Sequence, residues 1–157
     1  PTPTPTPTPK KLNLNKMTLD QLTYIVNGCA MKVHNTLGNG FQEVIYQRCL
    51  AIELRKAGLK FKREFEQVIL YEGRDVGTRR ADFVIEDKII VEIKAVINLE
   101  NVHLAQAKNY VVAYDFPIGL LINFGATSLQ FKKIFNAKYN NQLPHAPRPQ
   151  PHSPSNP

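Results

Sequence analysis

The stretch that decides the fold is RADFVIEDKIIVEIKA, residues 80–95. Apolar, β-forming residues lie on both sides of Asp87, which predicts two strands, 78–86 and 88–97, joined by a tight turn. A turn centred on Asp87 places Asp82 opposite Glu92. Directly opposed like charges destabilise a sheet, because their Cβ atoms are only about 4.5–5.5 Å apart. The pattern therefore needs a physical explanation.

A divalent cation would explain this pairing of carboxylates. Lys94 lies two residues beyond Glu92, so both side chains share one face of the strand. Mg²⁺ takes oxygen ligands, usually one or two carboxylates together with water and substrate phosphate. The Lys94 ammonium could hold or deprotonate a water, or stabilise charge developing on a phosphate. An exposed strand end with a Glu–Lys salt bridge explains the same residues equally well.

The segments around this hairpin predict a single α/β domain. Segments with apolar residues at helical spacing are predicted as helices: 18–36, 41–56 and 99–115. Thr18 is the predicted N-cap of the first helix. Alternating or continuously apolar segments are predicted as strands: 60–72, 78–86, 88–97, 118–124 and 129–135. The order is ααβββαββ. Continuous apolar runs at 89–91 and 120–122 indicate central strands covered on both faces, hence an α/β sandwich with a mixed sheet.

Both ends of the chain differ in composition from its middle. Eleven of the 12 prolines lie within residues 1–9 and 144–157. Proline fixes φ and donates no N–H, and these ends offer little apolar surface to bury. We expect residues 1–16 and 142–157 to be disordered tails, which leaves 17–141 as one domain. The turn signal Glu72-Gly73-Arg74-Asp75 lies inside that domain.

Charge gives a weak indication of the partner. The chain carries a formal net charge of +7, but four of its 20 basic residues lie in the tails. The remaining 16 basic residues face 13 acidic ones, a net +3. This balance favours a polyanionic partner only mildly, and an ordinary basic protein fits it as well.

The two cysteines, Cys29 and Cys49, have no metal-ligand spacing. A reduced, cytoplasmic interior is the simple interpretation, although a disulfide also fits the sequence. No run reaches the roughly 18 apolar residues of a membrane span, so we expect no membrane partner.

Four motifs together resemble a known family. Asp82 followed by Glu92-Ile93-Lys94 resembles the PD-(D/E)xK nuclease signature, with Arg80-Ala81 in place of its proline. Three further segments are similar to motifs of the GxxExxY branch and of related nucleases: Gly40-Phe41-Gln42-Glu43-Val44-Ile45-Tyr46, Gln106-Ala107-Lys108-Asn109-Tyr110 and Asn123-Phe124-Gly125. The resemblance covers about residues 18–136.

The resemblance implies a restriction-endonuclease-like core and metal-dependent nuclease activity, with DNA as the expected substrate and RNA as the alternative. It implies a Mg²⁺ or Mn²⁺ ion held by Asp82, Glu92 and the backbone carbonyl of Ile93. Glu43 would project from the second helix toward that ion as a further ligand and catalytic residue. Lys94 would position the water that attacks the phosphodiester.

Helical spacing independently supports the grouping of these motif residues. Gln106 and Tyr110 are four residues apart and share a helix face, as do Glu43 and Tyr46, three apart. Gln106, taken as catalytic, and Tyr110 could order Lys94 or touch a phosphate. For Tyr110, a half-buried position on a polar helix face fits slightly better.

Three other residues are weaker candidates for substrate or supporting contacts: Tyr46, His34 and Arg80. A capping or partly buried role fits His34 better. Arg79, Arg80, Lys62 and Arg63 could follow a phosphate backbone, or simply be solvated charges. We expect His103 to lie on the surface.

Two other functions fit the sequence. One is a nucleic-acid-binding module that keeps the nuclease fold without catalysis. The other is an interaction protein whose proline-rich ends bind aromatic-lined grooves. The sequence leaves the oligomeric state open, a homodimer included.

Overall fold

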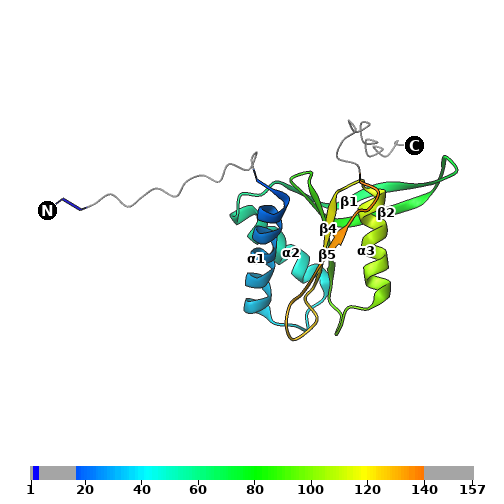
Figure 1. Cartoon of the computed structure of the whole chain (residues 1–157). Coiled ribbons are helices and arrows are strands. Elements are labelled where there is room, and N and C mark those ends of the chain that lie inside the picture. The colour runs from blue at the N-terminus through cyan, green and yellow to red at the C-terminus, as the bar shows by residue number, and fades with distance from the viewer. Residues whose placement is uncertain (1, 4–16, 140–157) are drawn as a thin grey trace, which may run out of the picture.

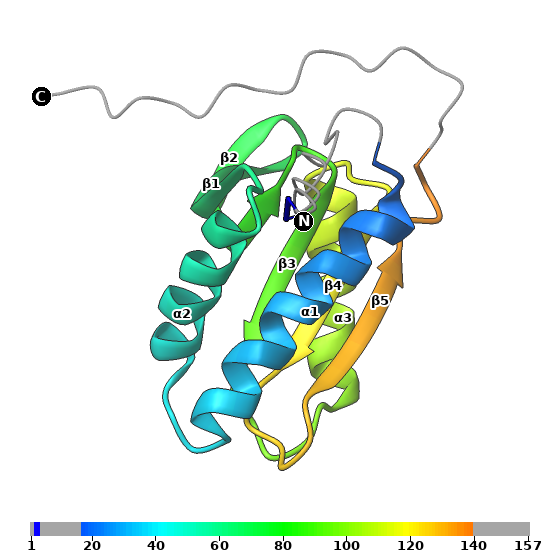
Figure 2. The same ribbon diagram turned by 90° about the vertical axis from the view of Figure 1, so that its left-hand side faces the viewer.

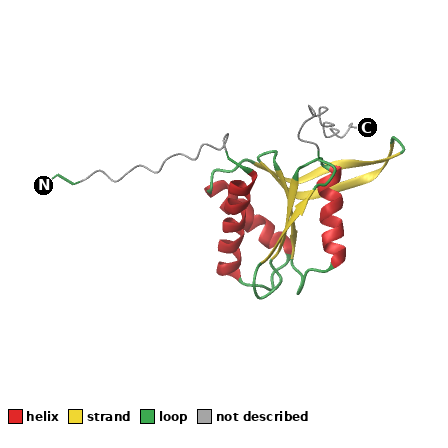
Figure 3. Cartoon of the chain, viewed as in Figure 1, coloured by secondary structure: helices red, strands yellow, loops and turns green. Residues whose placement is uncertain are grey.

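A computed structural model describes residues 2–3 and 17–139. The predicted tails lie outside these ranges, apart from residues 2–3. The described part contains three helices: α1 (Leu19–Leu37), α2 (Glu43–Lys56) and α3 (Asn101–Ala113). It contains five strands: β1 (Phe61–Tyr71), β2 (Arg74–Ile85), β3 (Ile89–Lys94), β4 (Ile118–Asn123) and β5 (Gln130–Phe135). The predicted order ααβββαββ is confirmed, and Figure 3 shows the helices on both sides of the sheet.

The sheet has the strand order β1-β2-β3-β4-β5. Within the described residues, β3 and β4 form the one parallel pair, and α3 is the crossover between them. Every residue of β4 is buried, as are the first five of β3, which confirms the two central strands. Helices α1 and α2 cover one face of the sheet and α3 covers the other (Figure 1), as expected for strands that are apolar on both faces.

Two apolar cores lie on the two faces of the sheet. Between the sheet and the α1–α2 pair, the core includes Leu50, Phe83 and Ile122. Between the sheet and α3, it includes Val84, Leu121 and Val111. Burying each such side chain fully contributes about 1.5–3 kcal/mol. Figure 2 shows α1 in front of the central strands on the first face, with α2 beside it.

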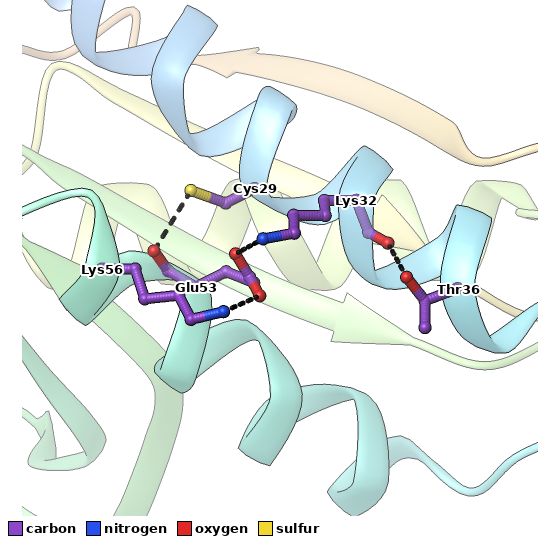
Figure 4. A network of polar contacts seen from close by, with 5 residues as sticks. All are labelled: Cys29, Lys32, Thr36, Glu53 and Lys56. Atoms are coloured by element: carbon purple, nitrogen blue, oxygen red, sulfur yellow. Dashed lines mark hydrogen bonds and ion pairs between the residues drawn. The ribbon is translucent and has the colours of Figure 1, made fainter.

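Polar contacts join α1 to α2 at the edge of the larger core (Figure 4). Lys32 Nζ lies 3.1 Å from a Glu53 carboxylate oxygen, and Lys56 Nζ lies 3.3 Å from the other. The Lys32 hydrogen bond lowers the pKa of Glu53. The Cys29 thiol donates to the Glu53 carbonyl at 3.6 Å. These contacts join the middle of α1 to the C-terminal half of α2.

The structure shifts several element boundaries. Thr18 is confirmed as the N-cap of α1, where its side chain accepts from the Gln21 N–H. Helix α2 begins at Glu43 rather than at 41, because Gln42 is extended and forms the N-cap. Strand β2 begins at Arg74 rather than at 78, because Glu72 and Gly73 both adopt positive φ and close a two-residue turn. The resulting β1–β2 hairpin projects beyond the body of the domain (Figure 1).

No helix within the described ranges is long and apolar enough to cross a membrane.

Candidate active site

The β2–β3 hairpin has the register predicted from its turn. Ile85 pairs with Ile89, and Phe83 pairs with Val91, the last pair of the ladder. The next two residues are Asp82 and Glu92, so both carboxylates lie where β2 and β3 separate. The sheet therefore opens at the acidic pair.

Asp82 occupies the position that a strand partner would take. Its Oδ2 accepts the Ile93 N–H at 2.7 Å, and its Oδ1 accepts the Gln47 side-chain amide at 3.0 Å. Ala81 belongs to the core under α3, whereas Phe83 belongs to the core under α1 and α2. Residues two apart share a face in a regular strand, so the alternation of β2 breaks at Asp82. This break turns the carboxylate toward β3.

Gln47 is a functional candidate that sequence reasoning missed. It is buried on α2, donates to Asp82, and accepts from Arg63 Nη2 at 2.9 Å. Gln47 thus links the Asp82 carboxylate to a cation on β1. Its spacing of four residues from Glu43, on the same helix face, is the signal that could have indicated it.

Glu92 is a buried carboxyl without a full set of partners. Its residue is 8% exposed, and Oε1 has no hydrogen-bond partner among the described residues. Burial, and then the nearby Asp82 charge, raise the pKa of Glu92 to about 9. Burial also raises the pKa of Asp82, against the lowering effect of its hydrogen bonds. Two adjacent carboxyls in a dry site cannot both carry a negative charge unless a cation lies between them, so without a cation one of them keeps its proton.

Lys94 and Glu92 line one cavity of about 310 Å³ between the sheet and α3. Gln106 and Tyr110 of α3 line the same cavity, so the structure brings these four predicted residues together. Asp82 is not among the residues that line the cavity. It lies beside Glu92, at the point where β2 and β3 separate. Tyr110 is half-buried, as we expected for a tyrosine on a polar helix face. Its ring stacks on that of Tyr114, with 6.1 Å between the ring centroids.

Glu43 approaches the acidic pair from the first turn of α2. It is exposed, but partial burial raises its pKa, Lys94 lowers it, and Asp82 raises it. The Glu43 carboxylate therefore lies close enough to the charges of Lys94 and Asp82 to interact with both. An acidic side chain in the first turn is also stabilised by the helix dipole.

Three sequence candidates lie away from the cavity. Tyr46 is fully buried, and its hydroxyl donates to the Gly38 carbonyl at 2.6 Å. His34 is buried on α1, and its Nε2 lies 3.0 Å from the Ala126 carbonyl. Arg80 is exposed, with Nη1 at 4.0 Å from a Glu64 oxygen. The contacts of Tyr46 and His34 stabilise the loops at the ends of α1 and β4.

Two cavity residues received little weight from the sequence. His103, expected on the surface, lines the cavity, and its Nδ1 accepts the Glu100 N–H at 2.9 Å. Arg79, rather than Arg80, also lines it. His103 lies three residues before Gln106, on the same face of α3, which is the signal that could have indicated it.

The loop after Lys94 is held tightly against the end of β4. The Asn123 side chain accepts the Val96 N–H at 3.0 Å and donates to the Val96 carbonyl at 2.8 Å. A Cβ on Gly125 would lie 2.4 Å from the Ala95 carbonyl carbon. The Phe124 N–H donates to the Lys94 carbonyl at 2.8 Å. This packing fixes the backbone on which Lys94 stands.

The donor set suits a hard divalent cation. Among the described residues, no group of three or more His, Cys, Asp or Glu side chains is placed to hold a metal ion. The adjacent Asp82 and Glu92 nevertheless provide the one or two carboxylates that Mg²⁺ commonly uses. The N–H and C=O of one strand residue point to the same side, so the Ile93 carbonyl faces the Asp82 side like its N–H. The partnerless Glu92 oxygen is the atom best explained by a ligand.

Comparison with protein families gives one clear match. Residues 20–134 match the family model described as the PD-(D/E)XK nuclease superfamily. A comparison of this chain with curated proteins finds no match. A solved structure described as "Crystal structure of SSO0001" is similar, with 22% identity and a TM-score of 0.49. The match covers 59% of this chain, and this chain spans half the length of that one (50%).

Proposed function

We propose that this chain, which belongs to the PD-(D/E)XK nuclease superfamily, is a metal-dependent nuclease that hydrolyses phosphodiester bonds in DNA. One observation carries the proposal: Glu92 is buried beside Asp82, has an oxygen without a hydrogen-bond partner among the described residues, and lines a cavity with Lys94. A purely structural sheet would not collect these groups at its centre, because each costs free energy to bury.

Asp82, Glu92 and the Ile93 carbonyl would hold a Mg²⁺ or Mn²⁺ ion, with Glu43 as a further ligand at the edge. When bound, this ion would stabilise negative charge on the phosphate and make water a better nucleophile. Gln47 keeps Asp82 oriented, and Arg63 in turn orients Gln47. The hydrogen bond from Ile93 holds the second Asp82 oxygen.

Lys94 would hold the attacking water by donating a hydrogen bond to it, on the cavity side of Glu92. Gln106 lines the same cavity from α3 and would contact the water or a phosphate oxygen. Tyr110 lies one turn further along α3 and forms the cavity wall. Positioned acid–base groups of this kind typically contribute 10²- to 10⁴-fold in rate.

The GxxExxY branch is the proposed place of this chain within the superfamily. Gly40 has φ of 108°, which few other residues adopt, and it leads into Glu43. The Tyr46 hydroxyl closes the same loop by binding Gly38 and Phe41. Each residue of the motif thus has a role in presenting Glu43. A cytoplasmic location is part of this proposal, and free Cys29 and Cys49 are compatible with it.

Cleavage assays with the full chain test the function. We expect it to cut DNA with Mg²⁺ or Mn²⁺, and to cut RNA more slowly. Lys94→Ala should lower the rate by roughly 100-fold or more. Lys60→Ala, which removes an exposed lysine outside the cavity, is the matched control.

No cleavage with either metal, or full activity of Lys94→Ala, would contradict the proposal. Salt-dependent DNA binding without cleavage would instead support a non-catalytic binding module. Capture of a protein partner independently of nucleic acid, lost on removal of the tails, would support an interaction protein.

A further inference from the structure

Arg79 and Arg80 are neighbours on β2 with different surroundings. Arg80 is exposed and weakly paired with Glu64. Arg79 lines the cavity, and its Cζ lies 4.6 Å from the centre of the Tyr110 ring. The Tyr114 hydroxyl donates to the Phe65 carbonyl at 2.6 Å and lies 3.1 Å from the Arg79 carbonyl, so it packs against the backbone at this position. The guanidinium is therefore held against α3 rather than moving freely in solvent.

The buried nitrogens of Arg79 lack partners. Nε and Nη1 are shielded from solvent and have no hydrogen-bond partner among the described residues. Arginine stays charged in proteins and cannot lose a proton to reduce this cost. The contact with the Tyr110 ring is a cation–π interaction and supplies no hydrogen-bond acceptor to these N–H groups. A buried charged donor without an acceptor destabilises the fold more than a neutral one does.

The chemistry of the cavity favours an anion as an acceptor for the Arg79 guanidinium, which lines it. Arg79, Lys94 and His103 line it together with a single carboxylate, Glu92, which the proposed function assigns to the metal. Its volume of about 310 Å³ is about ten times that of a water molecule, roughly 30 Å³. A phosphate group fits there, and two oxygens of a phosphate match two guanidinium donors in geometry.

We propose that Arg79 binds a phosphate group of the nucleic-acid strand, next to the phosphate that is cut, while Tyr110 holds the guanidinium in position. This inference rests on the proposed nuclease function. Arg79 is then a determinant of substrate binding, and Tyr110 is a positioning residue. The phosphate is either an internal diester or a terminal monoester, which present the same oxygens to Arg79.

Binding of inorganic phosphate tests the subsite without any cleavage. The full chain, free of divalent metal, is titrated with phosphate while the arginine Nε–H signals are followed by NMR. The Arg79 signal, identified by its loss in Arg79→Gln, should shift with a Kd on the order of millimolar, as for one charge-assisted contact. An Arg79 signal that does not move overturns the proposal.

Cleavage kinetics then separate the two kinds of phosphate. Arg79→Gln should raise KM by roughly 10- to 100-fold, with a smaller effect on kcat. An equal rise for 5′-phosphorylated and 5′-hydroxyl oligonucleotides indicates an internal diester, and a rise for the phosphorylated one alone indicates a terminal monoester. Arg74→Gln, an exposed arginine at the start of β2, is the matched control. Equal KM values for the two variants overturn the proposal.

The role of Tyr110 has its own readout. Tyr110→Leu should weaken phosphate binding and raise KM, whereas Tyr110→Phe should restore both, because the ring is retained. Phosphate binding at Arg79 without cleavage under any condition would support the subsite while the nuclease proposal fails. Cleavage with unchanged KM in Arg79→Gln would overturn the subsite alone.

Discussion

The Asp82 carboxylate accepts the backbone N–H of Ile93 at 2.7 Å, across the point where β2 leaves β3. A side chain here replaces the backbone partner that a continuous ladder would provide. One carboxylate therefore serves both the sheet and the proposed metal.

This double role makes Asp82→Asn and Asp82→Ala differ in stability but not in metal binding. The asparagine oxygen can still accept the Ile93 N–H, whereas alanine leaves that donor unpaired at a cost of about 1–3 kcal/mol. We expect both variants to lose Mn²⁺ binding in calorimetric titrations, and only Asp82→Ala to melt several degrees lower. Wild-type affinity in either variant would remove Asp82 from the metal site.

The raised pKa of Glu92 predicts a pH-dependent stability in the absence of metal. Folded Glu92 keeps its proton up to about pH 9, whereas the unfolded residue loses it near its ordinary value of 4.5. The unfolded state thus binds fewer protons in this window, so stability falls as the pH rises from about 4.5 to 9. Glu92→Gln stays neutral, and its melting temperature in EDTA should fall less steeply over this window. Parallel melting curves of the two proteins against pH would refute the assignment.

Replacing Gly125 or Gly28 by alanine should change the stability of the protein in opposite directions. A Cβ at Gly125 would lie 2.4 Å from the Val96 backbone nitrogen, whereas a Cβ at Gly28 on α1 meets nothing within 4 Å. We expect Gly125→Ala to destabilise the fold by about 1–3 kcal/mol, and to slow cleavage by displacing Lys94. Gly28→Ala should stabilise the protein by up to about 1 kcal/mol, because alanine favours helix. Urea unfolding measures both, and a neutral Gly125→Ala would show that the 95–97 loop can move.

Gln47→Ala tests whether Gln47 positions Asp82. The variant removes the amide that donates to Asp82 and the oxygen that accepts from Arg63. We expect a lower kcat and weaker Mn²⁺ binding, with the secondary structure retained. Gln47→Glu should bind metal more tightly than Gln47→Ala, since it places a second negative charge beside Asp82 and the proposed cation. Unchanged metal affinity in both variants would limit Gln47 to a packing role.

Much of the fold follows from local patterns. Apolar periodicity located every helix and strand, and the turn at Asp87 predicted the pairing that the hairpin adopts. Boundaries were wrong where backbone conformation decides them. The β1–β2 turn needs only Glu72 and Gly73, because both adopt positive φ, and spacing of residue types does not reveal this.

The site was harder to predict than the fold, because it depends on contacts between distant elements. Lys94 and Gln106 were candidates from their motifs, and the parallel pairing of β3 with β4 places α3 above Lys94. Gln47 meets Asp82 only through the packing of α2 on the sheet, which no local pattern encodes. The choice between Arg79 and Arg80 likewise depends on which side of β2 faces α3.

The parallel β3–β4 pair also bears on how the protein folds. The β2–β3 hairpin needs only local contacts, whereas the β3–β4 pair waits for the α3 crossover, and contacts distant in sequence form more slowly. We expect the two carboxylates to meet early and the wall formed by Gln106 and Tyr110 to close over them late. A newly made chain would then acquire the proposed nuclease activity only when its last elements dock, so that the order of folding would protect nucleic acid from a half-formed site.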